Sequence, residues 1–305
     1  MKKTLPFILI TCLISWLAAG IFYFAVENPT TGTSTYNLFA MLYMLFPAIV
    51  AILLQKLLNK EAIVKPFMIS FRINRWFLVA LVTPLLIIFV SIGVNLLFPN
   101  VQFTTTGEGM IERYSSTMPA ETLDAMRTQM ENINIKLMIL ITVVQGFLAA
   151  CTINGLFALG EELGWRGYML HHMRNYSFIK VSLLTGAIWG IWHFPLILMG
   201  HNYPNHPVIG VLFMVIFCTL LSPMMTYIVI KSKSVITAAV FHGSMNAFAG
   251  LPLIFLVGGN DLTNGFQGLA GFITTLIFTF GFFIFDKYIT KEGIFSKTVL
   301  ESLAD

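Results

Sequence analysis

The sequence predicts an all-α protein: a polytopic membrane bundle of about eight transmembrane helices plus one extracytoplasmic interfacial helix. Only 10% of the 305 residues are charged and 57% are hydrophobic, whereas about a quarter of the residues in soluble domains are charged. The charges are bunched, which leaves apolar stretches of the roughly 20 residues that cross about 30 Å of hydrocarbon. The basic residues fall in short segments between these stretches, which is typical of membrane topology and not of a nucleic-acid-binding surface.

Eight apolar stretches define the expected spans. The first follows Lys2 and Lys3 and is longer than the apolar region of a signal peptide, so we interpret it as a retained span. A stretch containing Pro204 and Pro207 separates the fifth span from the sixth, because a helix does not easily continue through prolines. The expected spans are about 4–26, 37–54, 76–98, 137–160, two within 181–230, 235–257 and 266–285.

Lysine and arginine positions predict the orientation of these spans. If the N-terminus is cytoplasmic, only Arg113, Arg127 and Lys136 of the 18 basic residues lie outside. Because cytoplasmic loops are enriched in lysine and arginine, we expect both termini to be cytoplasmic. The short lysine-rich loops, with no appended domain, suggest one integral domain over residues 1–305 of a bacterial plasma membrane.

The long outer loop, residues 99–135, carries a helical pattern in its second half. Pro119 suits a first helical position, and Leu123, Met126, Met130 and Ile133 then form one apolar stripe. We expect a helix lying on the bilayer surface. A lid over a substrate site is the alternative.

Three polar clusters lie where apolar residues are expected, and ionisable groups at membrane depth are commonly functional. The first contains Glu161, Glu162 and Arg166, at the inner end of the expected fourth span. In a helix Glu162 and Arg166 are i, i+4 neighbours, whereas Glu161 points about 100° away. Arg166 would then hold Glu162 and leave Glu161 free as a general base. The structural alternative is a charge cluster among the headgroups.

The second cluster lies in the fifth span and the third in the seventh. His193 lies roughly 13 residues beyond Lys180, or about 20 Å into the membrane at the helical rise, with Trp189 one turn before it. His242 and Asn246 are i, i+4 neighbours that face one direction. Each pair has a structural alternative, which is hydrogen bonding between helices.

Two small residues follow His242 in the third cluster. Gly243 and Ser244 have side chains that would let the seventh span approach its neighbours closely. Together the three clusters supply carboxylates, two imidazoles and an amide, which are groups able to activate water and stabilise an oxyanion.

In order, spacing and span placement, the three clusters resemble the motifs of the CAAX prenyl protease and bacteriocin-processing family of intramembrane proteases, which includes the type II CAAX endopeptidase. These motifs read Glu-Glu-x-x-x-Arg, aromatic-x-x-x-His and His-x-x-x-Asn, and Trp189 stands where the family often has Phe. The resemblance covers roughly the second half of the chain and implies a catalytic core over about 136–257. It implies that Glu161 is the base that activates water and that His193 helps to hold this water. It also implies that His242 and Asn246 bind the developing oxyanion, and that Glu162 and Arg166 form a supporting pair that orients the site.

Metal dependence stays open at this point. The soluble zinc signature His-Glu-x-x-His is absent. Glu161, His193 and His242 could nevertheless supply the three protein ligands of a catalytic Zn²⁺. We favour water activated directly by the glutamate, without a cofactor.

The depth of Glu161 in the membrane is a separate question. If the fourth span ends near Gly160, Glu161 meets His193 only through a strong tilt, an early helix start, or a water-filled funnel open to the cytoplasm.

The resemblance implies a membrane-embedded protease, glutamate-type or metallo-type, that hydrolyses a peptide bond. The expected partners are the lipid bilayer and a peptide or protein substrate, either CAAX-like and prenylated or of the bacteriocin type. We expect no nucleic acid. The alternative functions are a proton-coupled transporter, which would use the same intramembrane carboxylates and imidazoles, and a non-catalytic immunity or binding protein.

The remaining candidate residues are interpreted as structural. The cysteines lie inside apolar runs, so we expect core residues and not a disulfide framework; they are Cys12, Cys151 and Cys218. Four further histidines are interpreted as ordinary surface residues: His171, His172, His201 and His206.

Overall fold

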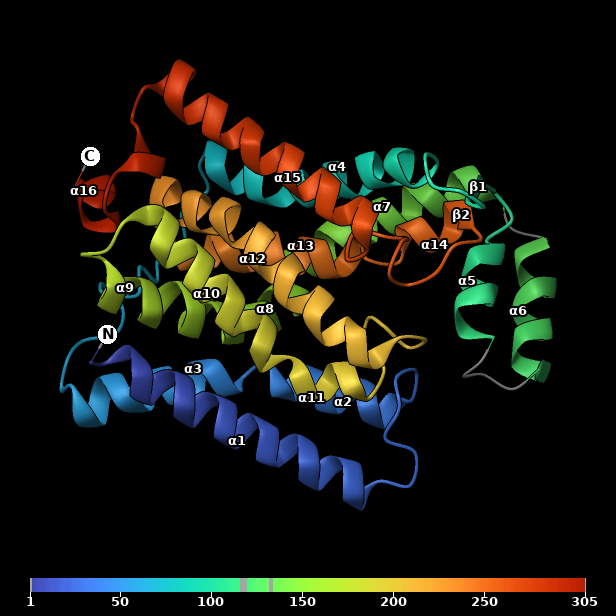
Figure 1. Ribbon diagram of the computed structural model, residues 1–305, viewed down its shortest axis with the longest axis horizontal. Helices are drawn as coiled ribbons and strands as arrows, with labels where there is room; N and C mark the ends of the chain where they lie inside the picture. The colour runs from blue at the N-terminus through green and yellow to red at the C-terminus, as the bar shows by residue number, and fades with distance from the viewer. Residues whose placement is uncertain (1, 116–119, 132–133, 305) are drawn as a thin grey trace.

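The computed structural model describes residues 2–115, 120–131 and 134–304, which form a bundle of helices elongated along one axis (Figure 1). Short π-helical turns continue several of the helices. The α-helices are α1 Thr4–Ala25, α2 Ser34–Tyr43, α3 Phe46–Leu53, α4 Arg75–Asn95, α5 Glu108–Tyr114, α6 Ala120–Glu131, α7 Ile135–Cys151, α8 Ile153–Glu162, α9 Leu170–Met173, α10 Phe178–Trp192, α11 Phe194–Leu198, α12 Pro207–Ser232, α13 Val235–Phe248, α14 Leu251–Phe255, α15 Leu269–Ile284 and α16 Val299–Ala304. The other elements are the π-helical segments η1 Leu54–Leu58, η2 Leu163–Met169 and η3 Phe285–Thr290, the 3₁₀ turn η4 Ile294–Ser296, and the antiparallel strands β1 Gln102–Phe103 and β2 Leu256–Val257.

The all-α membrane fold is confirmed. Among the described residues six helices are long and apolar enough to cross a membrane, and a seventh is added if α6 and α7 count as one bent span. Large apolar side chains such as Leu9, Leu13 and Leu17 of α1 face outward and are more than half exposed. An outer surface of this kind is solvated by lipid.

Interruptions in two of the expected spans bear directly on the site. The fifth divides between α10 and α11, and the fourth breaks at Thr152, whose backbone lies outside the helical region (φ −123°, ψ −105°). The expected end of the fourth span near Gly160 is wrong, because the chain stays helical through α8, η2 and α9 to Met173. Glu161 therefore lies about 18 Å from that end at the helical rise, a depth similar to that expected for His193.

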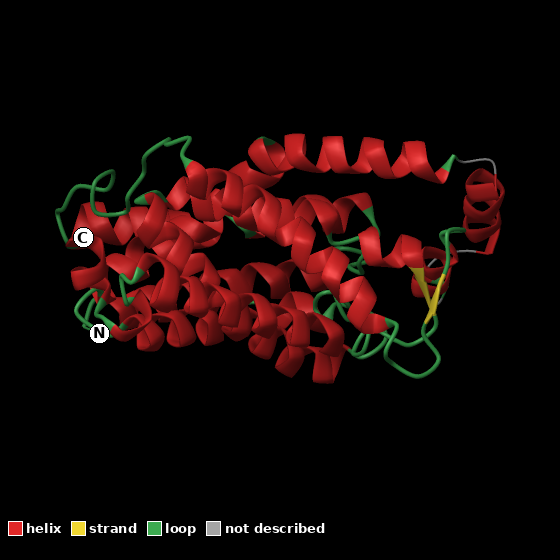
Figure 2. Ribbon diagram, turned by 90° about the horizontal axis from the view of Figure 1, so that it is seen from above, coloured by secondary structure: helices red, strands yellow, loops and turns green. Residues whose placement is uncertain are grey.

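Both termini lie at one end of the bundle, as the two ribbon views show (Figures 1 and 2). An even number of membrane crossings places the ends of a chain in this way. That this face is cytoplasmic remains a prediction from the basic residues.

The loop between α4 and α7 lies across the opposite end of the bundle (Figure 1). Its second half is helical as expected, and α6 meets α7 at 107°. Leu123 of the expected stripe is buried, whereas Pro119 and Ile133 lie outside the described residues. The first half contains a further helix, α5, and a Cβ added at Gly107 would lie 2.6 Å from the Met130 sulfur. The stripe is therefore covered partly by protein.

Small residues bring α13 against two neighbours, as expected. A Cβ added at Gly243 would lie 2.7 Å from the backbone nitrogen of Gly155 in α8, and Ser244 Oγ donates to the Leu81 carbonyl of α4 at 2.7 Å. The contact at Gly243 holds α13, which carries His242, against α8, which carries Glu161.

We expect Gly243→Ala to destabilise the protein by about 1–3 kcal/mol, because the added methyl group overlaps backbone that has no rotamer to change. The measurement is thermal unfolding in detergent. Gly93→Ala in α4 is the matched control, since a Cβ there has no atom within 4 Å. Equal melting temperatures for the two variants would contradict the close contact between α8 and α13.

The prediction of three core cysteines is partly wrong. Cys12 and Cys218 are buried, but Cys151 is exposed. Cys151 is the last residue of α7, on the apolar outer face and next to the break at Thr152.

Candidate active site

Residues from the three polar clusters line one cavity of about 540 Å³ inside the bundle. Glu161 comes from α8, Trp189 and His193 from α10 and its C-terminus, and His242 and Asn246 from α13. The ionisable groups are deeply buried, with Glu161 2% exposed, His193 7% and His242 4%. Buried ionisable groups are commonly paired or line a cavity, and here both conditions are met.

Glu162 and Arg166 form the expected ion pair, with Arg166 Nη1 3.2 Å from Glu162 Oε1 and both side chains at most 1% exposed. The same oxygen accepts a hydrogen bond from His242 Nδ1 at 3.0 Å. Arg166 Nη2 donates to Ser222 Oγ of α12 at 3.2 Å. Three helical segments are thus joined through one carboxylate, which is engaged in the ion pair and turned away from the cavity lining.

Glu161 points away from this ion pair but is not free of contacts. Its Oε2 accepts a hydrogen bond from the indole nitrogen of Trp189 at 2.6 Å. Among the described residues no hydrogen bond is found to Oε1. One oxygen is therefore fixed in position, and the other is available to a molecule in the cavity.

His193 lies at the break between α10 and α11, where Pro195 in the first turn of α11 lacks a backbone donor. Its Nδ1 contacts the Trp189 carbonyl at 2.8 Å, which fixes a proton on Nδ1 because a carbonyl only accepts. In the neutral ring Nε2 then carries a lone pair. This nitrogen can accept a hydrogen bond from water.

His242 has the opposite electrostatic environment. Its Nδ1 donates to the Glu162 carboxylate, and a carboxylate partner stabilises the imidazolium form. A protonated ring presents a second donor, Nε2–H. Asn246, one turn further along α13, is exposed to the cavity and offers an amide donor.

Trp189 contacts four ionisable side chains at this end of the cavity, which are those of Glu161, His193, His242 and Arg166. Its ring lies 5.8 Å from the His193 ring and 5.3 Å from the His242 ring between centroids. The Arg166 guanidinium carbon lies 4.6 Å from its centroid. Together with the hydrogen bond to Glu161, these contacts make Trp189 the side chain that orients the others.

Comparison with known proteins identifies the segment that carries these residues. Residues 134–248 match the family model described as type II CAAX prenyl endopeptidase Rce1-like. The chain is also 36% identical over 97 residues to CAAX prenyl protease 2 of Methanococcus maripaludis. This segment of the chain is therefore similar to the type II CAAX prenyl endopeptidases. The alignment to that relative covers 30% of this chain and 36% of the relative, so the likeness is confined to about a third of each protein.

In this CAAX-protease-like chain the cavity extends toward the end opposite the termini. Its lining includes Asn37 near the start of α2, His201 and Asn202 in the loop before α12, and Gln267 before α15. Of the three arrangements considered for Glu161, this lining does not favour the inward funnel, because η2 and α9 continue the helix beyond Glu161 toward the end that carries the termini. In the topology predicted from lysine and arginine, the mouth faces the extracytoplasmic side.

The three residues considered as possible zinc ligands do not form one cluster of ligand atoms among the described residues. Among the described residues the cluster of three whose ligand atoms lie close enough for one ion is elsewhere, and it does not include Glu161, His193 or His242. Glu161 Oε2 and both Nδ1 atoms are already hydrogen-bonded to Trp189 or Glu162.

Several residues of the site were missed at the sequence level. Ser222 holds Arg166, and Tyr43 of α2 donates to the Trp192 carbonyl at 3.0 Å, where the α10 helix ends. Pro223 beside Ser222 was a weak signal of irregularity in α12. His201 was interpreted as a surface residue, which is wrong, because it is half-buried in the cavity lining.

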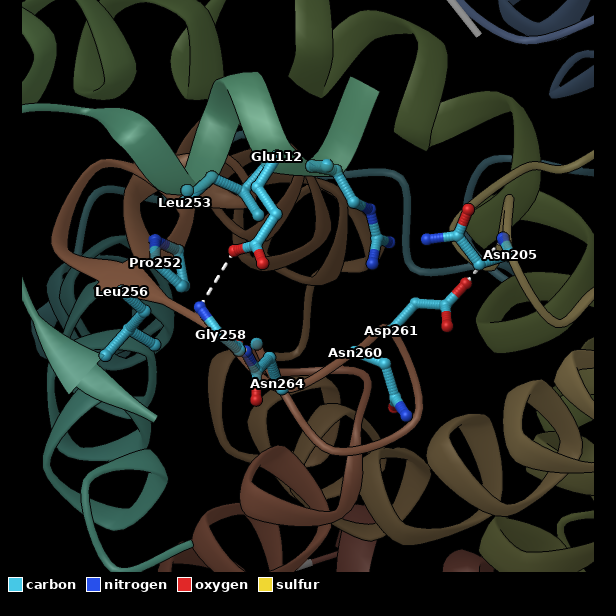
Figure 3. Close-up of a pocket in the computed structure, with 13 residues that line it drawn as sticks. Glu112, Asn205, Pro252, Leu253, Leu256, Gly258, Asn260, Asp261 and Asn264 are labelled. Atoms are coloured by element: carbon cyan, nitrogen blue, oxygen red, sulfur yellow. Dashed lines mark hydrogen bonds between the residues drawn. The ribbon is translucent and has the colours of Figure 1, made fainter. Parts of the chain in front are cut away.

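The outer loop is attached to the rim of this cavity. Figure 3 shows Glu112 of α5 accepting a hydrogen bond from the Gly258 backbone nitrogen at 2.8 Å, and Asp261 accepting one from Asn205 at 2.8 Å. Arg113 donates to the carbonyl of Asn202, which lines the mouth. The loop thus fixes the segments that form the entrance.

Proposed function

We propose that this protein is an intramembrane endopeptidase that hydrolyses a peptide bond with a water molecule activated by Glu161. The observation that carries the proposal is the cavity itself, where one carboxylate, two imidazoles and an amide from three helices converge. The similarity of residues 134–248 to type II CAAX prenyl endopeptidases supports the same reaction class, and the M. maripaludis relative is described as a protease.

The geometry suits a two-step hydrolysis. Glu161 takes a proton from water, which His193 Nε2 holds as an acceptor, and the hydroxide attacks the peptide carbonyl carbon. His242 Nε2–H and the Asn246 amide donate to the oxyanion that forms. As the C–N bond breaks, Glu161 returns the proton to the leaving amine. Glu162 and Arg166 stay paired throughout and hold His242 in place.

The cavity wall suits a substrate with an apolar side chain or lipid group near the cleaved bond. Met41, Met214, Phe217 and Met245 line it beside the polar floor. Methionine walls adapt to different apolar shapes. A CAAX-like prenylated peptide and an apolar bacteriocin-type peptide both meet this description.

The test is cleavage by the purified protein in lipid vesicles, using a prenylated CAAX-type peptide, the same peptide without its lipid, and an apolar bacteriocin-type peptide. Mass spectrometry identifies the products. Cleavage of any of these peptides supports the proposal, and the ratio of rates measures the need for lipid. Intact peptides together with proton-coupled solute uptake in the same vesicles would favour a transporter.

We expect Trp189→Phe to lower kcat by about tenfold or more with a smaller change in KM. The substitution keeps an aromatic ring but removes the donor that holds Glu161, and hydrogen bonds to charged groups contribute about 1.5–3 kcal/mol. Trp192→Phe is the matched control, because that indole donates to Ser15 at 2.9 Å and not to Glu161. Equal kcat values for the two variants would contradict a positioning role for Trp189.

A further inference from the structure

A second cluster of ligating side chains lies at the end of the bundle that carries the termini, away from the cavity. Glu61 comes from the loop after η1, and His171 and His172 come from α9. They line a separate pocket of about 490 Å³ together with Lys3 and Arg174. Both histidines were expected to be ordinary surface residues, but they are half-buried and contact each other.

The three side chains converge on one point. One ligand atom from each lies within 4.8 Å of the other two. The Glu61 Oε2 to His171 Nε2 distance is 3.9 Å, and the two imidazole rings are 4.8 Å apart at 71°. Ligand atoms around a tetrahedral Zn²⁺ with bonds of roughly 2.0–2.2 Å lie about 3.4 Å apart. Side-chain rotations that shorten the present separations by up to about 1.4 Å would therefore bring all three into coordination.

Gln55 connects two of the three ligands from behind. It is fully buried, and its amide nitrogen donates to Glu61 Oε2 at 3.1 Å and to the Ala62 carbonyl at 3.0 Å. Both amide protons are then used, so Gln55 Oε1 must be the group that faces His172 Nε2 at 2.9 Å. That contact places the proton of His172 on Nε2 and leaves a lone pair on Nδ1. Orientation of a histidine by such an outer partner is typical of metal sites.

The charges around the cluster set the affinity. Lys3 Nζ lies 2.7 Å from Glu61 Oε1, which leaves Oε2 to face the histidines. Arg174 Nη1 lies 3.3 Å from His171 Nδ1, so binding through Nε2 shifts the ring proton to Nδ1 and releases this exposed arginine. The two nearby cations favour moderate over very tight binding.

We propose that Glu61, His171 and His172 form a binding site for a divalent transition-metal ion of the Zn²⁺ class, separate from the catalytic cavity. A His₂Glu set leaves the fourth tetrahedral position to water, which the adjoining pocket supplies. The bound ion joins the segment after η1 to the C-terminal end of the helix that carries Glu161. The site stands on its own geometry and does not depend on the protease reaction.

The test is a titration of the full-length protein in detergent with Co²⁺, followed by its visible d–d absorption, with Zn²⁺ as competitor. We expect H171A/H172A to bind one ion fewer per chain than wild type. We expect the affinity of E61Q for that ion to fall by about tenfold or more. His206→Ala is the matched control, since His206 lies at the opposite end, paired with Asp261. Zn²⁺ is expected to raise the Tm of wild type by more than that of H171A/H172A.

Equal stoichiometry and affinity in wild type, H171A/H172A and E61Q would overturn the proposal. An equal loss of Co²⁺ in the His206→Ala control would also overturn it, because binding would then follow surface histidines in general. If H171A/H172A does not fold, E61Q alone decides, since glutamine keeps the shape of Glu61. Metal bound in the catalytic cavity would persist in all these variants, so it is distinguished by stoichiometry.

Discussion

Glu161→Gln is expected to reduce peptide cleavage by about 10²–10⁴-fold, the range that a positioned general base contributes. Glutamine can still accept the Trp189 hydrogen bond through its carbonyl oxygen, so the helix packing around it should survive. What is lost is the oxygen that takes a proton from water. The measurement is the initial rate of product formation in vesicles, with the amount of folded protein determined from its thermal unfolding.

The matched control is Glu27→Gln, which makes the same chemical change at an exposed residue beyond the end of α1. We expect its cleavage rate to equal that of wild type. A Glu161→Gln protein that cleaves at the wild-type rate would disprove the proposed mechanism. If Glu161→Gln and Glu27→Gln both failed to cleave, the assay or the protein preparation would be at fault, and the result would say nothing about the base.

Arg166→Ala is expected to destabilise the protein by about 3–5 kcal/mol, which is typical when one partner of a buried ion pair is removed. Glu162 is fully buried, and without Arg166 its charge retains only His242 as an ionic partner. Cleavage should fall as well, because the carboxylate that orients His242 loses its own support. Denaturant unfolding in mixed micelles measures the first effect, and kcat measures the second.

Ser222→Ala provides the scale for this effect, because it removes one hydrogen bond from Arg166 and leaves the ion pair intact. We expect a loss of about 1 kcal/mol for that variant. Arg166→Lys should fall between the two, since it keeps the charge but cannot donate to Glu162 and Ser222 as a fork. Similar unfolding free energies for Arg166→Ala and Ser222→Ala would contradict the importance of the buried pair.

The fold could be predicted from the sequence because the lipid solvent imposes a simple rule on composition. Apolar runs and basic loops give the spans and their order, and i, i+4 spacing predicted that Arg166 pairs with Glu162 and not with Glu161. The contact at Gly243 followed from residue size alone. These are local properties, which one chain segment expresses without reference to its neighbours.

The sequence could not predict features that depend on partners distant along the chain. Glu161 and Glu162 suggested the end of a span, because charges are expected near headgroups, whereas His242 and Ser222 allow this cluster to be buried. The end of the bundle toward which the cavity extends could not be predicted for the same reason. His201 lines the cavity mouth because the loop before α12 lies beside the cavity. The hydropathy of the loop does not indicate this position.

The position of Trp189 has a consequence for how the site can vary among related proteins. Its indole donates to Glu161, and its ring stacks with the Arg166 guanidinium and packs against the imidazoles of His193 and His242. Substitutions at residues that share one neighbour are not additive in their free energies. Changes at these positions should therefore be strongly epistatic, so that a replacement at Trp189 is tolerated only alongside compensating changes on α8 or α13.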